Sequence, residues 1–383
     1  MKESLLYKII LVGFVMLVVC FANFAVGANF HEKPYAGTTI TWIYQEHTTT
    51  PLYKAKLSQF EKETGIKVNV EVYPYRELME KQKMAYALGS SDYDVGFVQL
   101  FNLREWVKKG WIEPLDKYMK NSKITRDEWL AWDDFIGDTA KVYSIEGKQW
   151  GLPAYTEAQI FYYRKDLLKK YGIEPPQTLA GLEQVAKKLH EQGITAIALR
   201  ARREWFNAPY IWSYFLHSFG GDYFDYETME PILNSPEAVK ATELYARLLN
   251  KYGPKGAAAI DWEDVRDLML AGKVAMIIDC SGWAARFEES KPIMGKLGYA
   301  PPPKGPAGSF TGYGSNAFFI PKFSKHKKAA WQFIQWAINP ENRIYQATHG
   351  SSYIDRWSTL RNMEVRKIQN FPGFLDALKT ALG

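Results

Sequence analysis

The middle of the chain, from Gly151 to Gly172, reads Gly-Leu-Pro-Ala-Tyr-Thr-Glu-Ala-Gln-Ile-Phe-Tyr-Tyr-Arg-Lys-Asp-Leu-Leu-Lys-Lys-Tyr-Gly. Pro153 restricts the backbone at the start of this stretch, and the β-rich composition of residues 154–163 favours an extended chain. Residues 165–171 have the polarity of a helix, and Gly172 is suited to ending one. The stretch therefore predicts a strand, a second strand and a helix.

The chain before this stretch alternates strands and helices. Strands are predicted over residues 39–44, 66–73 and 95–98, with helices over residues 52–64 and 76–88 between them. A strand, a helix and a second strand in this order form a βαβ unit, whose two strands are parallel. We therefore expect one α/β lobe to be nearly complete by Met119.

The chain after this stretch repeats the pattern. Thr178 and Ser235 suit the N-caps of two helices. Further strands are predicted over residues 195–199, 274–279 and 317–320, and further helices over residues 210–219, 263–271, 325–338, 341–348 and 372–382. Because single domains usually stop growing well below 383 residues, the sequence predicts an α/β protein of two lobes.

Several segments resemble one protein family in their order along the chain. Besides the middle stretch they are Phe60-Glu-Lys-Glu-Thr-Gly-Ile-Lys-Val, Asp94-Val-Gly-Phe-Val, Gly272-Lys-Val-Ala-Met, Pro301-Pro-Pro-Lys-Gly-Pro and Ala329-Ala-Trp-Gln-Phe-Ile. From about Thr38 to about Asn362 the chain resembles the extracellular solute-binding proteins of ABC sugar importers, the maltose-binding-protein-like family 1. The resemblance implies a two-lobed periplasmic-binding-protein fold of type II, with a ligand cleft between lobes joined by hinge crossings.

The resemblance also implies how the lobes and the partners are arranged. Residues 38–156 and 312–348 would form lobe 1, residues 157–311 and 349–383 lobe 2, and the crossings would lie near residues 155–160, 311–316 and 348–352. The expected function is to capture a sugar or sugar alcohol outside the cytoplasm and to deliver it to the membrane permease of an ABC transporter. A monomer is expected.

The N-terminus has the pattern of a secretory signal peptide over residues 1–28. Lys2 and Lys8 flank an apolar run over residues 9–21 that is too short for an ordinary membrane span, and small residues follow it. We expect cleavage before Ala28 or Asn29 and export to the periplasm or the extracellular space, the alternative being an uncleaved anchor. Val19 precedes Cys20 where lipoprotein signals have a small residue, which argues against lipidation of Cys20. Cys280 would then be a buried single thiol.

The sequence lacks the common motifs of enzymes and cofactor sites. The six histidines show no metal-ligand spacing, and neither a Gly-x-Ser-x-Gly elbow nor a phosphate loop occurs. The glycine-rich residues 305–316 precede a predicted strand rather than the helix that a dinucleotide fingerprint needs. The basic residues 322–328 predict a solvated helix start. We therefore expect no catalysis, metal, cofactor or nucleic acid partner.

Two alternatives stay open at this stage. A secreted glycoside hydrolase or lyase needs two carboxylates with no fixed spacing in the sequence, and the candidates are Asp92, Asp94, Asp133, Asp134 and Glu157. A binding protein for a solute that is not a sugar is the other alternative.

Candidate ligand-binding residues lie after the predicted strands of the first lobe, because ligand sites in open α/β sheets lie beyond the carboxyl ends of strands. Gln45, Glu46 and His47 follow the first strand, and Gln99 and Asn102 follow the third. The resemblance also implies ligand contacts in the loop that holds Gln99 and Asn102. A sugar or polyol needs such hydrogen-bonding groups together with aromatic faces.

Aromatic residues make up 15% of the chain and supply candidates for stacking on a ligand. The candidates beside predicted loops and crossings are Tyr155, Trp205, Trp283 and Tyr313, and Asn207 offers an amide next to Trp205. By resemblance, Glu157 aligns with a carboxylate that contacts sugar in maltose-binding protein, and Arg356 lies where relatives turn a polar group to the ligand. The segment that ends in Trp283 departs from the family pattern, in which the aromatic residue comes one position earlier.

Overall fold

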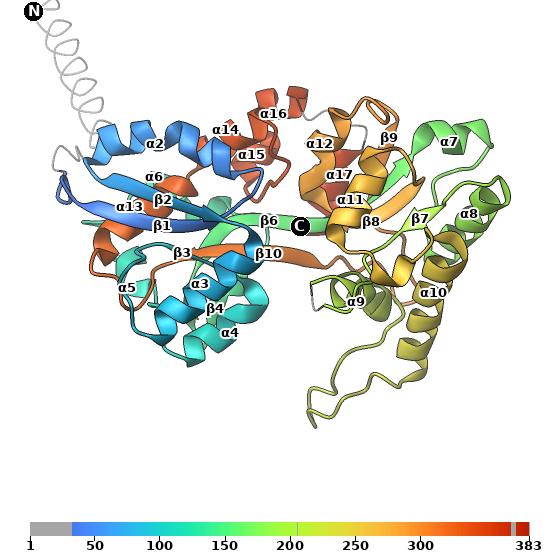
Figure 1. Cartoon of the computed structure of the whole chain (residues 1–383), viewed down its shortest axis with the longest axis horizontal. Helices are drawn as coiled ribbons and strands as arrows, with labels where there is room; N and C mark the ends of the chain where they lie inside the picture. The colour runs from blue at the N-terminus through green and yellow to red at the C-terminus, as the bar shows by residue number, and fades with distance from the viewer. Residues whose placement is uncertain (1–32, 205, 369–372, 383) are drawn as a thin grey trace, which may run out of the picture.

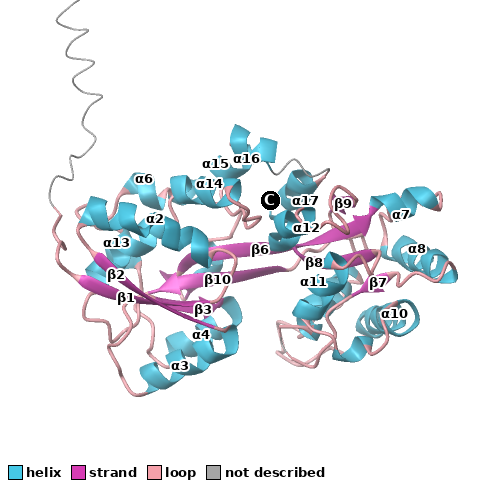
Figure 2. Cartoon of the chain, turned by 45° about the horizontal axis from the view of Figure 1, so that its top comes forward, coloured by secondary structure: helices cyan, strands magenta, loops and turns pink. Residues whose placement is uncertain are grey.

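A computed structural model describes residues 33–204, 206–368 and 373–382 of the chain. Its two lobes lie side by side and are joined by the long strands β6 and β10 (Figure 1). Helices flank the strands on both sides (Figure 2). The predicted two-lobed α/β class is confirmed. The predicted signal peptide, Cys20 and Trp205 lie outside the described residues.

The strands are β1 (Thr39–Gln45), β2 (Lys67–Tyr73), β3 (Gly96–Gln99), β4 (Ser144–Ile145), β5 (Lys148–Gln149), β6 (Leu152–Arg164), β7 (Ile197–Ala198), β8 (Met276–Cys280), β9 (Leu297–Ala300) and β10 (Tyr313–Phe319). The α-helices are α2 (Thr50–Thr64), α3 (Tyr75–Ala87), α4 (Leu100–Lys108), α5 (Asp116–Met119), α6 (Asp127–Leu130), α7 (Lys165–Lys170), α8 (Leu179–Glu191), α9 (Ala208–Ser218), α10 (Pro236–Tyr252), α11 (Trp262–Leu270), α12 (Ala284–Glu288), α13 (Lys327–Ala337), α14 (Pro340–Thr348), α15 (Trp357–Arg361), α16 (Met363–Ile368) and α17 (Phe374–Leu382).

Strand pairing follows the predicted βαβ unit. β1 and β2 are parallel, with Thr39 opposite Lys67 and Gln45 opposite Tyr73. The main sheet has the order β3, β10, β6, β8, β7, and β9 pairs with the far end of β6. The carboxyl ends of β1 and β3 therefore carry their polar residues toward the region where β6 and β10 cross between the lobes.

β6 differs from the prediction of two separate strands, because it is one continuous strand of 13 residues. Its first half pairs with β10, and its second half pairs with β8 and β9. Pro153, which has no N–H to donate, lies at the irregularity where β10 shifts register between Asn316 and Ala317. The proline thus marks a bulge within one strand, and nearly every residue of that strand is buried.

The cores explain most of the aromatic excess. One core gathers buried residues from the N-terminal part of the chain, β10 and α13, and in it Trp42 contacts the rings of Tyr53, Phe318 and Phe333 at 5.0–5.9 Å. Two further cores lie on either side of the sheet formed by β6, β7 and β8. Aromatic residues therefore serve mainly in packing. No helix in the described ranges is long and apolar enough to cross a membrane.

A buried arginine fixes the start of β6. Arg343 of α14 donates from Nη1 to the carbonyl of Ala154 at 2.9 Å and from Nη2 to that of Pro153 at 2.6 Å. Its Nη1 also donates to the Tyr53 hydroxyl at 2.7 Å, and its Nε lies 3.2 Å from the carboxylate of Asp355. Arg343 is 2% exposed and Asp355 is fully buried. This ion pair joins α14, β6 and the segment that follows α14.

Candidate ligand-binding site

Three rings and one amide gather where β1 meets β6. The His47 ring stacks on that of Tyr155 at 4.3 Å and 7°, and its Nε2 lies 3.1 Å from the hydroxyl of Tyr353. Gln45, the last residue of β1, donates from Nε2 to the Tyr155 hydroxyl at 2.6 Å. Burial lowers the pKa of His47 to about 3, so its imidazole is neutral at neutral pH. This side of the site offers neutral hydrogen-bonding groups and aromatic surface.

Glu157 lies on β6 two residues after Tyr155 and is paired with Gly314 of β10. A Cβ at position 314 would lie 2.6 Å from Oε1 of Glu157 and 3.0 Å from its Cγ, so the glycine leaves the space that the carboxylate occupies. Burial raises the pKa of Glu157, Arg200 opposes that effect, and Asp279 adds to it. Glu157 is thus a carboxylate in a restricted, largely desolvated position.

An ion pair lies at the carboxyl ends of two strands of the second lobe. Arg200 follows β7, and its Nε donates to Oδ2 of Asp279 in β8 at 2.9 Å, while its Nη2 donates to Oδ1. Burial alone would lower the pKa of Arg200, but the Asp279 carboxylate outweighs this and raises it. The guanidinium lies 4.5 Å from the ring centre of Tyr210 and 5.5 Å from that of Trp283. The pair therefore holds a charged group against two aromatic rings.

Two buried polar atoms near these groups lack a hydrogen-bond partner within the described part of the chain. They are the hydroxyl oxygen of Tyr210 and Oδ1 of Asn316, which lies on β10 opposite Tyr155. Buried polar atoms are rarely left unpaired in folded proteins, and such atoms require an explanation. A hydroxyl-bearing ligand is one explanation, since it can donate to both oxygens.

The two lobes also touch through a charged contact. Arg76 of α3 donates from Nη2 to both carboxylate oxygens of Glu204 at 2.9 Å, and its guanidinium lies 5.5 Å from the centre of the Phe206 ring. Tyr75 contacts the same Phe206 ring and donates its hydroxyl to Gln99 at the end of β3. This contact joins the end of β3 to the loop between β7 and α9.

The structure brings several predicted site residues together and separates others. Five predicted site residues belong to the clusters described above: Gln45, His47, Tyr155, Glu157 and Trp283. Gln99 accepts a hydrogen bond from Tyr75 at the contact between the lobes. Glu46 is exposed, and Asn102 is half-buried in the first turn of α4. Tyr313 begins β10 opposite Ala158, and only its backbone is described. Cys280 is a buried free thiol, as predicted.

Two predicted site residues form hydrogen bonds with other parts of the protein. Asn207 is fully buried, donates from Nδ2 to Glu204 at 2.9 Å and accepts from the backbone N–H of Trp262 at 3.0 Å. The side chain of Arg356, which the resemblance placed at the ligand, is fully buried. Its guanidinium donates to the carbonyls of Leu130, Ala131 and Ile338 at 2.8–2.9 Å.

Arg200, Asp279, Tyr210 and Tyr353 were missed as site residues. The sequence does mark the first two. Arg200 directly follows a predicted strand, and Asp279 is a charged residue at the end of another predicted strand that is otherwise apolar. Tyr210 and Tyr353 carry no such signal, since their positions depend on how α9 and the segment after α14 pack. The described residues hold no cluster of three or more His, Cys, Asp or Glu side chains that could bind a metal.

A two-lobed α/β fold with polar and aromatic groups gathered at the lobe boundary defines a solute-binding protein. The chain belongs to the family of bacterial extracellular solute-binding proteins, whose family profile matches residues 46–344. An erythritol/L-threitol-binding protein of Mycolicibacterium smegmatis is 26% identical over 94% of this chain and 79% of its own length. A mannitol-binding protein of Pseudomonas aeruginosa is 29% identical over 66% of this chain and 58% of its own length.

A solved structure gives the same picture of the fold. MalE3 of T. maritima with bound maltose superposes with a TM-score of 0.78 at 25% identity, covering 89% of this chain and 87% of that one. The fold and the family are therefore those that the motifs along the sequence indicated.

Proposed function

We propose that this protein captures a neutral sugar alcohol or sugar at the lobe boundary, without altering it, and delivers it to the permease of an ABC importer. The observation that carries the proposal is a pair of unpartnered buried oxygens: the hydroxyl of Tyr210, which lies within electrostatic range of Glu157, and Oδ1 of Asn316, on β10 opposite Tyr155. A polyol hydroxyl both donates and accepts, so it can satisfy these oxygens and also receive hydrogen bonds from neighbouring donors. The polyol and maltose ligands named for the relatives support the same class of ligand.

We further propose that the protein is exported after removal of its first 27 or 28 residues and acts as a monomer in the periplasm or outside the cell. The support is the Lys-flanked apolar run of the sequence, together with the extracellular family. The intact mass of the protein purified from its natural host checks this. A mass starting at Ala28 or Asn29 is expected, and a product that retains Met1 or starts at an acylated Cys20 would contradict it.

Lobe closure is part of the proposal. We assign residues 38–156 and 312–348 to one lobe and residues 157–311 and 349–383 to the other, with hinges where the chain crosses. The Arg76–Glu204 contact spans these two segments and would exist only in a closed form. Small-angle scattering with saturating ligand should give a smaller radius of gyration than the free protein.

A thermal-shift panel tests the ligand class most directly. The panel compares polyols, sugars, amino acids, polyamines and sugar phosphates. A ligand at a hundredfold excess over its Kd stabilises the folded state by about 2.7 kcal/mol. We expect polyols or sugars to raise the melting temperature. Stabilisation only by charged non-sugars would contradict the carbohydrate proposal, and product formation after prolonged incubation would indicate a hydrolase.

Glu157→Gln should weaken binding of the polyol or sugar found in the panel by about tenfold to a hundredfold. The variant keeps the shape of the side chain but removes charge-assisted hydrogen bonds, each worth about 1.5–3 kcal/mol. Calorimetry on the folded variant measures the change. Glu174→Gln, at an exposed carboxylate, is the matched control and should bind like the wild type. Unchanged affinity in Glu157→Gln would remove this residue from the site.

Gly314→Ala should weaken the same ligand without unfolding the protein. The new Cβ would displace the Glu157 side chain, so we expect about a tenfold loss of affinity and a loss of stability of about 1–3 kcal/mol. In the Glu157→Gln background the same substitution should have a smaller effect, because both changes act on one interaction. Calorimetry and thermal unfolding of the single and double variants check this. Full additivity of the two losses would show that Gly314 does not act through Glu157.

A further inference from the structure

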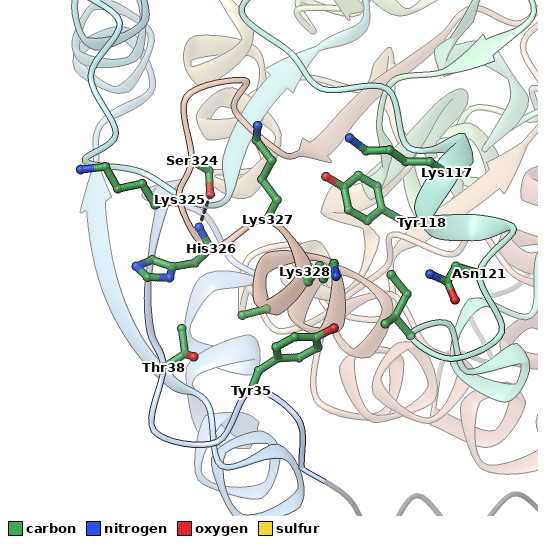
Figure 3. Close-up of a pocket in the computed structure, with 12 residues that line it drawn as sticks. Tyr35, Thr38, Lys117, Tyr118, Asn121, Ser324, Lys325, His326, Lys327 and Lys328 are labelled. Carbon is green, nitrogen blue, oxygen red and sulfur yellow. Dashed lines mark hydrogen bonds between the residues drawn. The ribbon is translucent and has the colours of Figure 1, made fainter.

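A basic groove of about 690 Å³ lies on the N-terminal lobe, apart from the site at the lobe boundary. It lies between Tyr35, the short helix α5 and the first turn of α13 (Figure 3). Figure 1 places α5 and α13 at the end of this lobe that is distant from β8. A volume of this size is typical of pockets for small ligands.

The groove is lined by four lysines, and two buried carboxylates, Glu113 and Asp94, bond to residues that line it. Glu113 is 2% exposed and is within ion-pair distance of Lys117, of Lys322 at 3.3 Å and of Lys327 at 3.5 Å. Burial alone would raise the pKa of Glu113, but these lysines outweigh it and lower the pKa, so the carboxylate is ionised. Glu113 therefore carries one negative charge against three lysines, of which Lys117 and Lys327 line the groove.

The donors of these lysines are only partly used. Lys117 donates a hydrogen bond to Oε1 of Glu113. Oε2 accepts no hydrogen bond in the described part of the chain, so its contacts with Lys322 and Lys327 are ion pairs without a hydrogen bond. Lys325 and Lys328 also line the groove, and no carboxylate among the described residues pairs with either. Ammonium hydrogens are thus left for another acceptor.

Other groups around the groove favour an anion. In Figure 3 Lys328 lies between the rings of Tyr118 and Tyr35, and Lys117 and Lys327 lie on one side of it. The first turn of α13 adds backbone N–H groups that have no acceptor within the helix. Ser324 is already engaged, since it donates to Asp94 at 2.6 Å and accepts from the N–H of His326 at 3.1 Å. A neutral polyol would find few acceptors here.

We propose that this groove binds a phosphate-type oxyanion, held by Lys117, Lys327 and Lys328. Lysine ammonium groups act as compact point charges for phosphate, and lysines from α5 and α13 line one hollow. The oxyanion could come from an aqueous phosphate or from the headgroup of an anionic lipid, whose chemistry is the same. The proposal does not depend on which solute binds at the lobe boundary.

The test compares two double variants with the wild-type protein. Lys117→Gln/Lys328→Gln removes two exposed charges from the groove, and Lys187→Gln/Lys188→Gln removes two exposed charges from α8 as the matched control. The first arm measures melting temperature in inorganic phosphate against chloride at equal ionic strength. The second measures cosedimentation with phosphatidylglycerol vesicles against phosphatidylcholine vesicles.

We expect stabilisation or vesicle binding in at least one arm for the wild type and the control. The affinity of the groove variant for phosphate or for phosphatidylglycerol vesicles should be weaker by a factor on the order of ten, because each lysine near an anionic surface contributes to the free energy of binding. A response to inorganic phosphate alone identifies an aqueous oxyanion, and a response to vesicles alone identifies a headgroup. No response in either arm, or equal losses in both variants, would overturn the proposal.

Discussion

Asp279→Ala is expected to lower the free energy of unfolding by about 3–5 kcal/mol, since it leaves the buried guanidinium of Arg200 without its counter-charge. Asp279 is fully buried and Arg200 is 6% exposed, so solvent cannot replace the lost partner. The loss also frees Arg200 from the position in which it contacts Tyr210 and Trp283. Urea denaturation of the wild type and the variant measures the difference.

The matched control is the double variant Arg200→Met/Asp279→Leu. Replacing both members of a buried ion pair by apolar side chains of similar size is often neutral for stability. We therefore expect the double variant to recover most of the stability lost in Asp279→Ala while binding ligand poorly. A single variant as stable as the wild type would mean that Arg200 is solvated, contrary to its burial.

Arg343→Met should also lower the free energy of unfolding by about 3–5 kcal/mol, because it removes the ion-pair partner of the buried Asp355 carboxylate. It also removes the donors to the carbonyls of Pro153 and Ala154 at the start of β6. Chemical denaturation measures the change. Arg247→Met is the control, since the Arg247–Glu183 pair is partly exposed and should cost less than about 1 kcal/mol. Equal losses in both variants would contradict a special role of Arg343.

Local signals predicted most of the long helices, but α4 and the short elements β4, β5 and β9 were not predicted, and β10 begins at Tyr313 rather than at residue 317. Thr178 and Ser235 cap α8 and α10 by accepting from the N–H groups of Gly181 at 3.1 Å and Ala238 at 3.2 Å, as the sequence suggested. Such caps depend on residues three positions apart, so they can be read from sequence. Asp261 caps α11 in the same way but was not recognised, and that helix was therefore predicted to begin one residue late.

Contacts between distant segments could not be predicted in the same way. Arg200 and Asp279 are 79 residues apart, and their pairing follows from the parallel register of β7 and β8. Arg356 reaches the carbonyls of Ala131 and Leu130, which are 225 and 226 residues away, and no local pattern indicates this. The basic run that predicted a solvated helix start does open α13, but its position against Glu113 depends on tertiary packing.

β6 runs unbroken from one lobe into the other. A substitution in it can therefore affect both ligand specificity and the connection between the lobes. Tyr155 contacts groups of the first lobe, and Glu157 is influenced by charges of the second, only two positions further along the same strand. A substitution that alters the preferred solute therefore also alters the strand about which the lobes are joined. With the hinge closure proposed above, a change of specificity on this strand would also shift the balance between open and closed forms, and β10, which pairs with it, is where a second substitution could restore that balance.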